Sequence, residues 1–395
     1  MSVWSSLVGQ EAAVAKLSDA AASARAIVAS RGGRASDEAR SMSHAWLITG
    51  PPGSGRSVAA RAFAAALQCT GETPGCGACP GCRTTMARTN ADVVFAATET
   101  SIINVDTARS LVLQAQSSPS QGLWRVIVVE DADRLGESGA NALLKAIEEP
   151  PEHTVWLLCA PSPEDMIATI RSRCRHLGLR IPTAAAVADL LVREGVATPD
   201  VALDAARAAQ SHIGLARALA RDPQMRERRR AIITAPASVR SVGEAVMAAD
   251  RLLETAKAQA DAQVSERNAR EKAELLRQLG MEEGESATKA SRTMIRQLEE
   301  DQKRRSKRAL TDAIDRALID LLAIYRDVLM VQVGGDGELI NTDLSDLVHE
   351  IAQDSTPRQT LARVDHIETA RRRLIANGNP LLVLEDMAIS LRPQA

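Results

Sequence analysis

The sequence AWLITGPPGSGRS, residues 45–57, places an apolar run directly before a glycine-rich loop and the start of an Ala-rich segment. Ala45–Thr49 has the character of a buried strand, and Ser57–Leu67 has the character of a helix. A loop of the form G-x-x-x-x-G-x-S between a strand and a helix lets backbone N–H groups and the helix N-terminus surround a phosphate. The stretch therefore predicts a nucleotide-binding loop in an α/β domain, with the candidate residues Gly50, Gly53, Ser54, Gly55, Arg56 and Ser57.

Two further apolar runs support the α/β prediction. Arg125–Glu130 and Val155–Cys159 have strand character, and the helical segment Gly139–Ile147 lies between them. Strands that alternate with helices favour an open parallel sheet covered by helices on both faces. After Thr183 the strand-like runs give way to helical periodicity rich in Ala, Leu and Arg, so we expect the rest of the chain to be helical.

The predicted nucleotide site departs from a hydrolysing site at two places. Arg56 stands where a lysine would present a compact charge to the terminal phosphates, and its planar guanidinium is bulkier. Glu130-Asp131 ends its strand in the reverse of the Asp-Glu order that an ATPase uses to hold metal and polarise water. Ser57 keeps the hydroxyl that would hold Mg²⁺. We therefore expect that ATP or ADP can bind but is not hydrolysed efficiently.

Four of the six cysteines are spaced C-x6-C-x2-C-x2-C: Cys69, Cys76, Cys79 and Cys82. Two overlapping C-x2-C knuckles and a fourth thiolate can close a tetrahedral zinc site, and the glycines and prolines between them supply the turns. Disulfides are the alternative, which a reducing cytosol disfavours. The spacing predicts structural Zn²⁺, with Cys159 and Cys174 as packing residues.

The composition limits the remaining functions. Lys+Arg 48 against Asp+Glu 50 gives a net charge of −2, which excludes a uniformly basic nucleic-acid-binding chain. Aromatic residues make up 2% of the chain, so few platforms exist on which single-stranded bases could stack. No apolar run reaches the roughly 18 residues of a membrane span, and the start MSVWSSLVGQ lacks the features of a secretory signal. We therefore expect a cytoplasmic protein.

Residues 254–308 are densely charged and are interrupted by Met281–Ser286. A long, solvated helical hairpin is one interpretation. The other is a basic tip at Lys303–Arg308 that contacts DNA.

Several motifs together resemble the AAA+ clamp-loader family of bacterial DNA polymerase III. The resemblance covers roughly residues 3–235 and rests on Trp4 with Leu7–Gln10, the phosphate loop, NALLKAIEEPP at Asn141–Pro151, and Ser172-Arg173-Cys174. Beyond this region only size and helical character agree. The resemblance implies an α/β AAA+ domain with a parallel sheet at 1–181 and an inserted zinc module at 69–82. It further implies a helical lid at 182–236 and an all-α collar for oligomerisation at 237–395, with the charged insertion at about 254–308.

The resemblance also implies residue roles. Arg173 corresponds to an arginine finger that projects into the ATP site of a neighbouring subunit. Arg217, in Gly214–Arg217, corresponds to the lid arginine that contacts the nucleotide. Hydrolysing members carry a polar sensor residue where this chain reads Cys159-Ala160-Pro161-Ser162, which is a third departure from a hydrolysing site.

These features predict a stator-like, non-motor subunit of the clamp loader, within the DNA polymerase III holoenzyme and without ATPase activity in isolation. Its implied partners are gamma/tau-type ATPase subunits, a delta subunit, the sliding clamp and, through the complex, primed DNA. The alternatives are an active gamma/tau-type ATPase and a zinc-dependent DNA-binding module. The near-neutral charge disfavours the DNA-binding module, and so does the presence of only Arg83 and Arg88 beside the cysteines.

Overall fold

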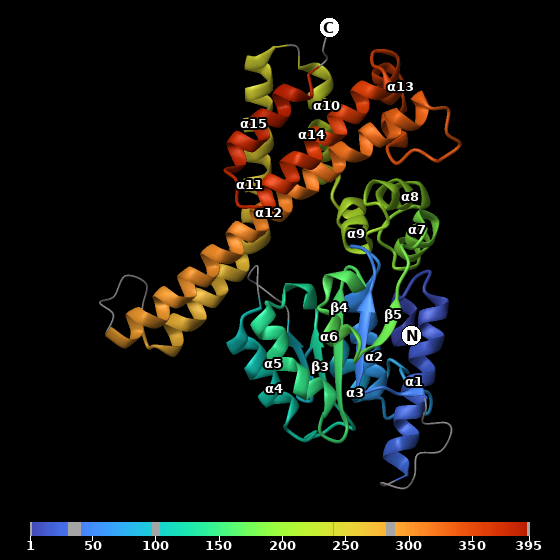
Figure 1. The fold of residues 1–395 in the computed structure, drawn as a ribbon, viewed down its shortest axis with the longest axis vertical. Helices are drawn as coiled ribbons and strands as arrows, with labels where there is room; N and C mark the ends of the chain where they lie inside the picture. Colours follow the sequence, from blue (N-terminus) through green and yellow to red (C-terminus); the bar gives the residue numbers. More distant parts are fainter. Residues whose placement is uncertain (1, 31–40, 97–102, 240, 282–288, 393–395) are drawn as a thin grey trace. The chain divides into compact units, whose positions relative to one another are not determined.

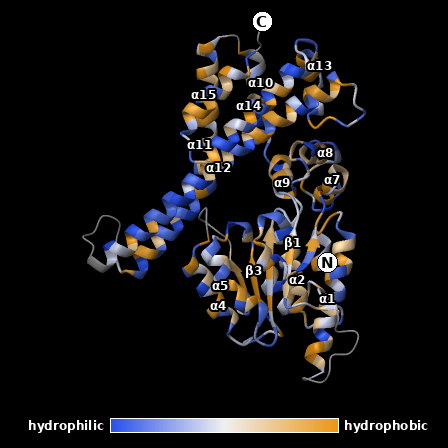
Figure 2. Cartoon of the chain, viewed as in Figure 1, coloured by the Kyte–Doolittle hydropathy of each residue, from blue (hydrophilic) through white to orange (hydrophobic). Residues whose placement is uncertain are grey.

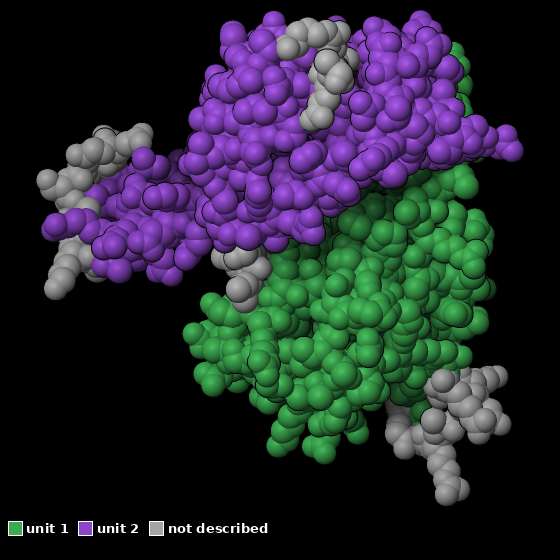
Figure 3. Space-filling model, turned by 45° about the horizontal axis from the view of Figure 1, so that its top comes forward, with its two compact units in different colours: residues 1–217 green, residues 218–395 purple. Residues whose placement is uncertain are grey.

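The computed structural model describes residues 2–30, 41–96, 103–239, 241–281 and 289–392 (Figure 1). The chain divides into two compact units, Met1–Arg217 and Ala218–Ala395, which Figure 3 colours separately. The finer division into a domain at 1–181, a lid at 182–236 and a collar at 237–395 stays a prediction. Within the described residues, no helix is both long and apolar enough to cross a membrane.

A parallel five-stranded sheet forms the centre of the first unit, as predicted, with the strand order β2-β3-β4-β1-β5 (Figure 1). Its strands are β1 (Ala45–Thr49), β2 (Val93–Ala96), β3 (Arg125–Val129), β4 (Thr154–Ala160) and β5 (Arg175–Gly178). The edge strands β2 and β5 are absent from the sequence-based prediction. In β5 only Leu177 is buried, so this strand has no apolar run to reveal it.

Helices cover both faces of the sheet because its strand residues alternate between two cores. Trp46, Val128 and Leu157 belong to the core that includes buried residues of α1 (Glu11–Ala29) and α2 (Arg56–Leu67). Leu47 and Trp156 belong to the opposite core. That core also holds residues of α4 (Val105–Ala115), α5 (Glu137–Glu148) and α6 (Ala168–Arg171). Alternation of this kind is expected of strands buried on both sides.

Short elements connect this frame: η1 (Val3–Ser6), α3 (Pro80–Met86), η3 (Ala132–Arg134) and η4 (Pro163–Asp165). Three helices follow the sheet: α7 (Ala184–Arg193), α8 (Pro199–Ala208) and α9 (Ile213–Arg221). Buried Leu191 of α7 and Ala202 of α8 lie on the apolar faces of this adjoining pair. The helix α9 continues past Arg217, where the first unit ends.

The second unit is helical throughout its described residues, as predicted for the chain after Thr183. It contains α10 (Pro223–Ser238), α11 (Val242–Gln278), α12 (Lys289–Gln332), η5 (Thr342–Leu344), α13 (Ser345–Gln353), α14 (Pro357–Ile375) and α15 (Pro380–Ser390). Its core is mainly aliphatic, with fully buried Ile314, Leu318, Val328, Ile367 and Leu384 and the aromatic Tyr325.

The described residues of the charged stretch 254–308 form the adjoining ends of α11 and α12, which are mainly hydrophilic in Figure 2. Residues 282–288, within the predicted interruption Met281–Ser286 and just after it, lie outside the described residues. The two helices are joined by the Arg305–Glu271 ion pair at 2.8 Å and by a hydrogen bond from Gln302 to the Asn268 carbonyl at 2.8 Å. Lys303–Arg308 lies within α12 and not at the turn between the helices. Arg304 also pairs with Asp301, at 2.6 Å. These internal ion pairs favour the solvated hairpin over a free basic tip.

Candidate nucleotide and metal sites

The glycine-rich loop lies between β1 and α2 and is packed from two sides. Gly53 and Gly55 have φ angles of 91° and 90°, a region that glycine adopts without steric cost. A methyl group on Gly53 would lie 2.9 Å from Cα of His212, the residue just before α9. The Gln10 amide donates to the Arg180 carbonyl at 2.6 Å and to the Ser54 carbonyl at 3.3 Å. The loop is therefore held in a defined shape by the protein itself.

The side chain of Arg56 turns back onto this loop. Its Nη1 donates a hydrogen bond to the carbonyl of Gly50, at 2.8 Å. The hydroxyl of Ser54 is buried and has no hydrogen-bond partner among the described residues. Ser57 is half-buried in the first turn of α2. The positively charged guanidinium of Arg56 is thus hydrogen-bonded to Gly50, the first residue of the loop.

Glu130, directly after β3, also forms an ion pair within the protein. Its Oε1 accepts from Nη2 of Arg88 at 2.5 Å. The Arg88 guanidinium lies over the ring of Phe95, 5.0 Å from its centroid. Arg61 of α2 is near both charges: burial and the neighbouring Arg88 lower its pKa, and Glu130 opposes this shift. In the sequence, Arg88 stands out only as a basic residue beside the cysteines.

Electrostatic effects at the end of β4 show that these groups gather at one edge of the sheet. Burial, together with the negative charges of Glu130 and Asp131, raises the pKa of Cys159 to about 12, and Arg56 opposes this shift. Ala160 closes the strand and is fully buried, and the Pro161 carbonyl accepts from the Gly50 N–H at 3.1 Å. The end of β4 therefore presents an apolar side chain to this edge, in line with the sequence.

The lid candidate Arg217 has a partner within its own unit. Its Nε and Nη2 donate to the carboxylate of Glu194, the C-cap residue of α7, at distances of 2.7–3.0 Å. Its contact with a nucleotide stays a prediction.

The four clustered cysteines meet around one point. The sulfur atoms of Cys69, Cys76, Cys79 and Cys82 all lie within 4.8 Å of one another, and those of Cys79 and Cys69 are 3.8 Å apart. Four thiolates about 2.3 Å from a tetrahedral Zn²⁺ would be separated by roughly 3.8 Å. All four are free thiols in the structure. The donor set and its spacing fit a closed, structural zinc site.

Hydrogen bonds lower the pKa of Cys69 and Cys79, whereas burial raises the pKa of Cys82. Burial alone would raise the pKa of Cys79, but hydrogen bonds from backbone N–H groups, including that of Cys82, lower it to about 5. Burial raises the pKa of Cys174, outside the cluster, to about 12. Cys159 and Cys174 are therefore poor nucleophiles, which agrees with their assignment as packing residues.

The N-terminal residues Val3 and Trp4 are hydrogen-bonded to the loop that carries the cysteines. The Val3 N–H donates to the Gly75 carbonyl at 3.0 Å, and the Trp4 indole donates to the Pro74 carbonyl at 3.4 Å. Arg25 of α1 donates to the Cys69 carbonyl at 2.9 Å. A methyl group on Gly75 would lie 2.7 Å from the Trp4 indole nitrogen, so the two segments are in close contact. The zinc loop is thereby joined to both η1 and α1.

Arg173 lies between α6 and β5 on the surface of the first unit. Its side chain is 36% exposed, pairs with Glu148 at the end of α5, and donates to the Thr169 carbonyl at 2.8 Å. The exposed position is compatible with a contact to another subunit. Glu148 belongs to the stretch Asn141–Pro151, but nothing in the sequence indicated that it holds Arg173.

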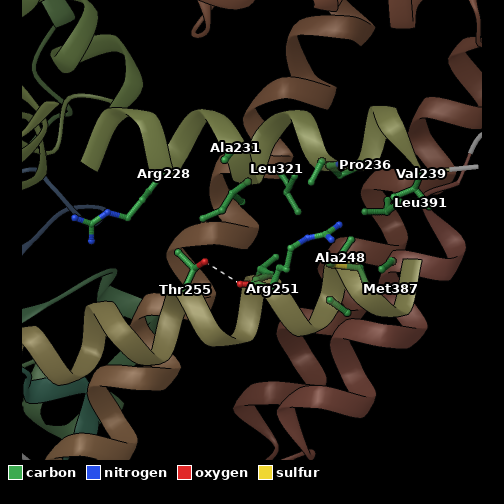
Figure 4. A pocket seen from close by; sticks show the side chains of 15 residues that line it. Arg228, Ala231, Pro236, Val239, Ala248, Arg251, Thr255, Leu321, Met387 and Leu391 are labelled. Atoms are coloured by element: carbon green, nitrogen blue, oxygen red, sulfur yellow. Dashed lines mark hydrogen bonds between the residues drawn. The ribbon is translucent and has the colours of Figure 1, made fainter. Parts of the chain in front are cut away.

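A cavity of about 200 Å³ lies elsewhere, in the second unit, between α10, α11 and α15 (Figure 4). Its lining is mainly apolar, and Arg251 extends between α10 and α11 (Figure 4). Residues of the phosphate loop, the cysteine cluster and the Arg173 segment take no part in this lining. The cavity is thus separate from the candidate sites.

Parts of the chain are similar to known subunits of DNA polymerase III. Residues 34–183 match the family model described as DNA polymerase III, delta subunit. The chain is 35% identical over 182 residues to DNA polymerase III subunit delta' of Escherichia coli, covering 45% of this chain and 54% of that protein. It is also 35% identical over 170 residues to DNA polymerase III subunit gamma/tau of Mycobacterium tuberculosis, covering 41% and 29%. The chain thus spans about half, or less, of the length of these relatives.

A solved DNA polymerase III gamma subunit-related protein from Thermotoga maritima aligns with a TM-score of 0.41 and 17% identity. This alignment covers 88% of this chain and 93% of that structure.

Proposed function

We propose that the protein is a delta-prime-type, non-motor subunit of a clamp loader, because residues 34–183 match the family model described as DNA polymerase III, delta subunit, and the chain is 35% identical over 182 residues to a delta' subunit. It assembles with gamma/tau-type ATPase subunits and a delta subunit. It supplies Arg173 to the ATP site of a neighbour, and the assembly loads a sliding clamp onto primed DNA. Its place of action is the cytoplasm.

The observation that best supports this proposal is that the charged side chains of the candidate nucleotide site are already bonded to other groups of the protein. Arg56 bonds to Gly50, and Glu130 pairs with Arg88. A hydrolysing site instead presents its cation to the phosphates and its carboxylate to the metal ion. A nucleotide bound here would find neither a free cation for its phosphates nor a free carboxylate for its metal ion. We therefore expect the nucleotide to bind without being hydrolysed. The buried Ala160 in place of a polar sensor acts in the same direction.

Arg173 is the group through which the subunit acts on its neighbour. Its guanidinium is partly exposed and is held by Glu148 and by the Thr169 carbonyl. These contacts orient the planar fork that bidentate phosphate recognition requires. In phosphoryl-transfer enzymes an arginine supplied in trans increases turnover by about 10³–10⁵-fold.

The zinc module has a structural role in this proposal. All four ligands come from the protein, so no coordination position is left for a substrate. Binding of the metal stabilises the loop between α2 and α3, on which η1 and α1 rest.

A gamma/tau-type ATPase is the second candidate, and the similar identity to gamma/tau and to delta' relatives favours considering it. The two candidates differ in one measurable property, which is ATP turnover by the isolated chain.

The experiment that tests the trans role replaces Arg173 by Ala in a reconstituted clamp loader at matched stoichiometry. We expect assembly and zinc content to be unchanged and clamp loading to fall strongly. DNA-stimulated ATPase activity should fall only in part, because the other ATP sites keep their own arginines. Arg173→Lys should resemble Arg173→Ala, since lysine lacks the planar fork.

Arg171→Ala is the matched control. Arg171 is an exposed arginine two residues away whose contact with the Pro163 carbonyl, at 3.4 Å, is local. Clamp loading at the unmutated level with Arg173→Ala would reject the arginine-finger role and leave the subunit as a scaffold.

A further inference from the structure

Arg88 adopts a backbone conformation that side chains other than glycine rarely take. Its φ angle is 60°, in the left-handed region, where a Cβ atom is sterically disfavoured. Two contacts offset this strain, because the guanidinium stacks on Phe95 and pairs with Glu130. Strain that surrounding contacts maintain in this way is a feature of functional sites.

The cysteine cluster fixes the start of the segment that carries Arg88. The helix α3 begins after Cys79, whose sulfur accepts from the Cys82 N–H at 3.4 Å. At the other end of α3, the Arg88 N–H donates to the Thr85 carbonyl at 3.0 Å. The position of the guanidinium on Glu130 is therefore set by the fold of the cysteine module.

The charges around the end of β3 leave little attraction for a divalent cation. Four arginines and three carboxylates influence one another here: Arg56, Arg61, Arg88, Arg134, Glu130, Asp131 and Asp133. Four positive and three negative formal charges give a sum of +1, whereas Mg²⁺ and Mn²⁺ are held by oxygen ligands of carboxylates together with phosphates and water. Glu130 already has a cationic partner at 2.5 Å. The residues present do not fit the metal ion of a hydrolysing phosphate loop.

We propose that Arg88 takes the place of the divalent cation at the end of β3, so that a nucleoside di- or triphosphate at the loop of residues 50–57 binds as a metal-free anion. Arg88 is then the residue that determines whether the nucleotide binds as a free anion or as its complex with a divalent cation. This inference rests on the proposed function, since it concerns the same non-hydrolysing site.

The test compares nucleotide affinity of the full chain in metal-free buffer and in excess MgCl₂. Unmutated protein should bind ATP and ADP no more tightly with Mg²⁺. Arg88→Gly removes the guanidinium and suits the positive φ, so it frees Glu130 without disturbing the turn. In this variant Mg²⁺ should increase affinity by about tenfold or more, because a bridging metal adds contacts to both carboxylate and phosphate.

A second measurement keeps the test decisive if nucleotide binding is too weak to follow. Bound Mn²⁺ is counted by electron paramagnetic resonance, with zinc content and melting temperature confirming the fold of each variant. The Arg88→Gly variant should bind one Mn²⁺ ion that unmutated protein does not bind. Adding Glu130→Gln to Arg88→Gly should abolish this Mn²⁺ site. Arg83→Ala removes an exposed charge from α3, the helix that precedes Arg88, and should behave as unmutated protein.

Two results would overturn the proposal. One is a Mg²⁺ or Mn²⁺ dependence that is the same in unmutated protein and in Arg88→Gly. The other is affinity of the unmutated chain that rises about tenfold with Mg²⁺. Failure of the proposed function is distinguishable, because it is measured by clamp loading with Arg173→Ala, a variant in which Arg88 is intact.

Discussion

Asp92, at the start of the segment that leads into β2, is a buried carboxylate that organises a loop distant in sequence. Its oxygens accept from the backbone N–H groups of Ser120, Gln121 and Gly122 at 2.6–2.8 Å. The Arg125 guanidinium lies 3.6 Å away. Burial alone would raise the pKa of Asp92, but these N–H donors lower it below its ordinary value. The loop before β3, and hence the strand that ends at Glu130, depends on this one side chain.

We expect Asp92→Asn to lower the free energy of unfolding of the first unit by about 2–4 kcal/mol, because an amide presents its NH₂ group to N–H donors that remain buried. The depressed pKa means that the stabilisation is present above the pKa of the unfolded chain and is lost as pH falls through the folded value. Urea unfolding at neutral and acidic pH measures both effects. Asp106→Asn, whose side chain is 84% exposed, is the control. Equal stability of Asp92→Asn and unmutated protein at neutral pH would contradict this account.

At the scale of elements, α3 and the preceding loop depend on the predicted metal. We expect purified protein to contain about one zinc per chain, and Cys79→Ser to lose it and to melt at a lower temperature, since structural zinc binding contributes folding free energy. Metal analysis with thiol protection and thermal unfolding check this. Cys174→Ser, outside the cluster, should keep its zinc. Less than about half an equivalent of zinc in unmutated protein would refute the assignment.

Sequence patterns predict elements best where the determinants are local. All five residues of β1 are buried, so its apolar run is visible in the sequence, and the cysteine spacing alone assembled the ligand set. The strand β5 was missed because its place follows from pairing with β1 and not from its own composition. The Arg88–Glu130 pair joins residues 42 positions apart in the sequence, and only the order of the strands brings them together. Its sequence signal is therefore absent, although the proposed metal-free binding of nucleotide depends on this pair.

At the scale of the whole molecule, the candidate chemistry is confined to one unit. The phosphate loop, the cysteine cluster and Arg173 all belong to residues 1–217, and the long charged hairpin of α11 and α12 belongs to residues 218–395. The three departures from a hydrolysing site lie on different elements: Arg56 on α2, Glu130 after β3, and Ala160 at the end of β4. A single substitution therefore restores only one of three required groups.

We expect the isolated full-length chain to hydrolyse ATP no faster than a blank preparation, and Arg56→Lys to leave this unchanged. The lysine would release the Gly50 carbonyl, but Glu130 would stay paired with Arg88 and Ala160 would still offer no polar group. Single-turnover assays with the purified chain measure this, and nucleotide binding measured in parallel separates lost binding from lost chemistry. A reconstituted clamp loader assayed under the same conditions is the positive control. Robust turnover by the unmutated isolated chain would reject the stator role in favour of the gamma/tau-type motor. Turnover gained by Arg56→Lys alone would show instead that the Arg88–Glu130 pair leaves the site competent for hydrolysis.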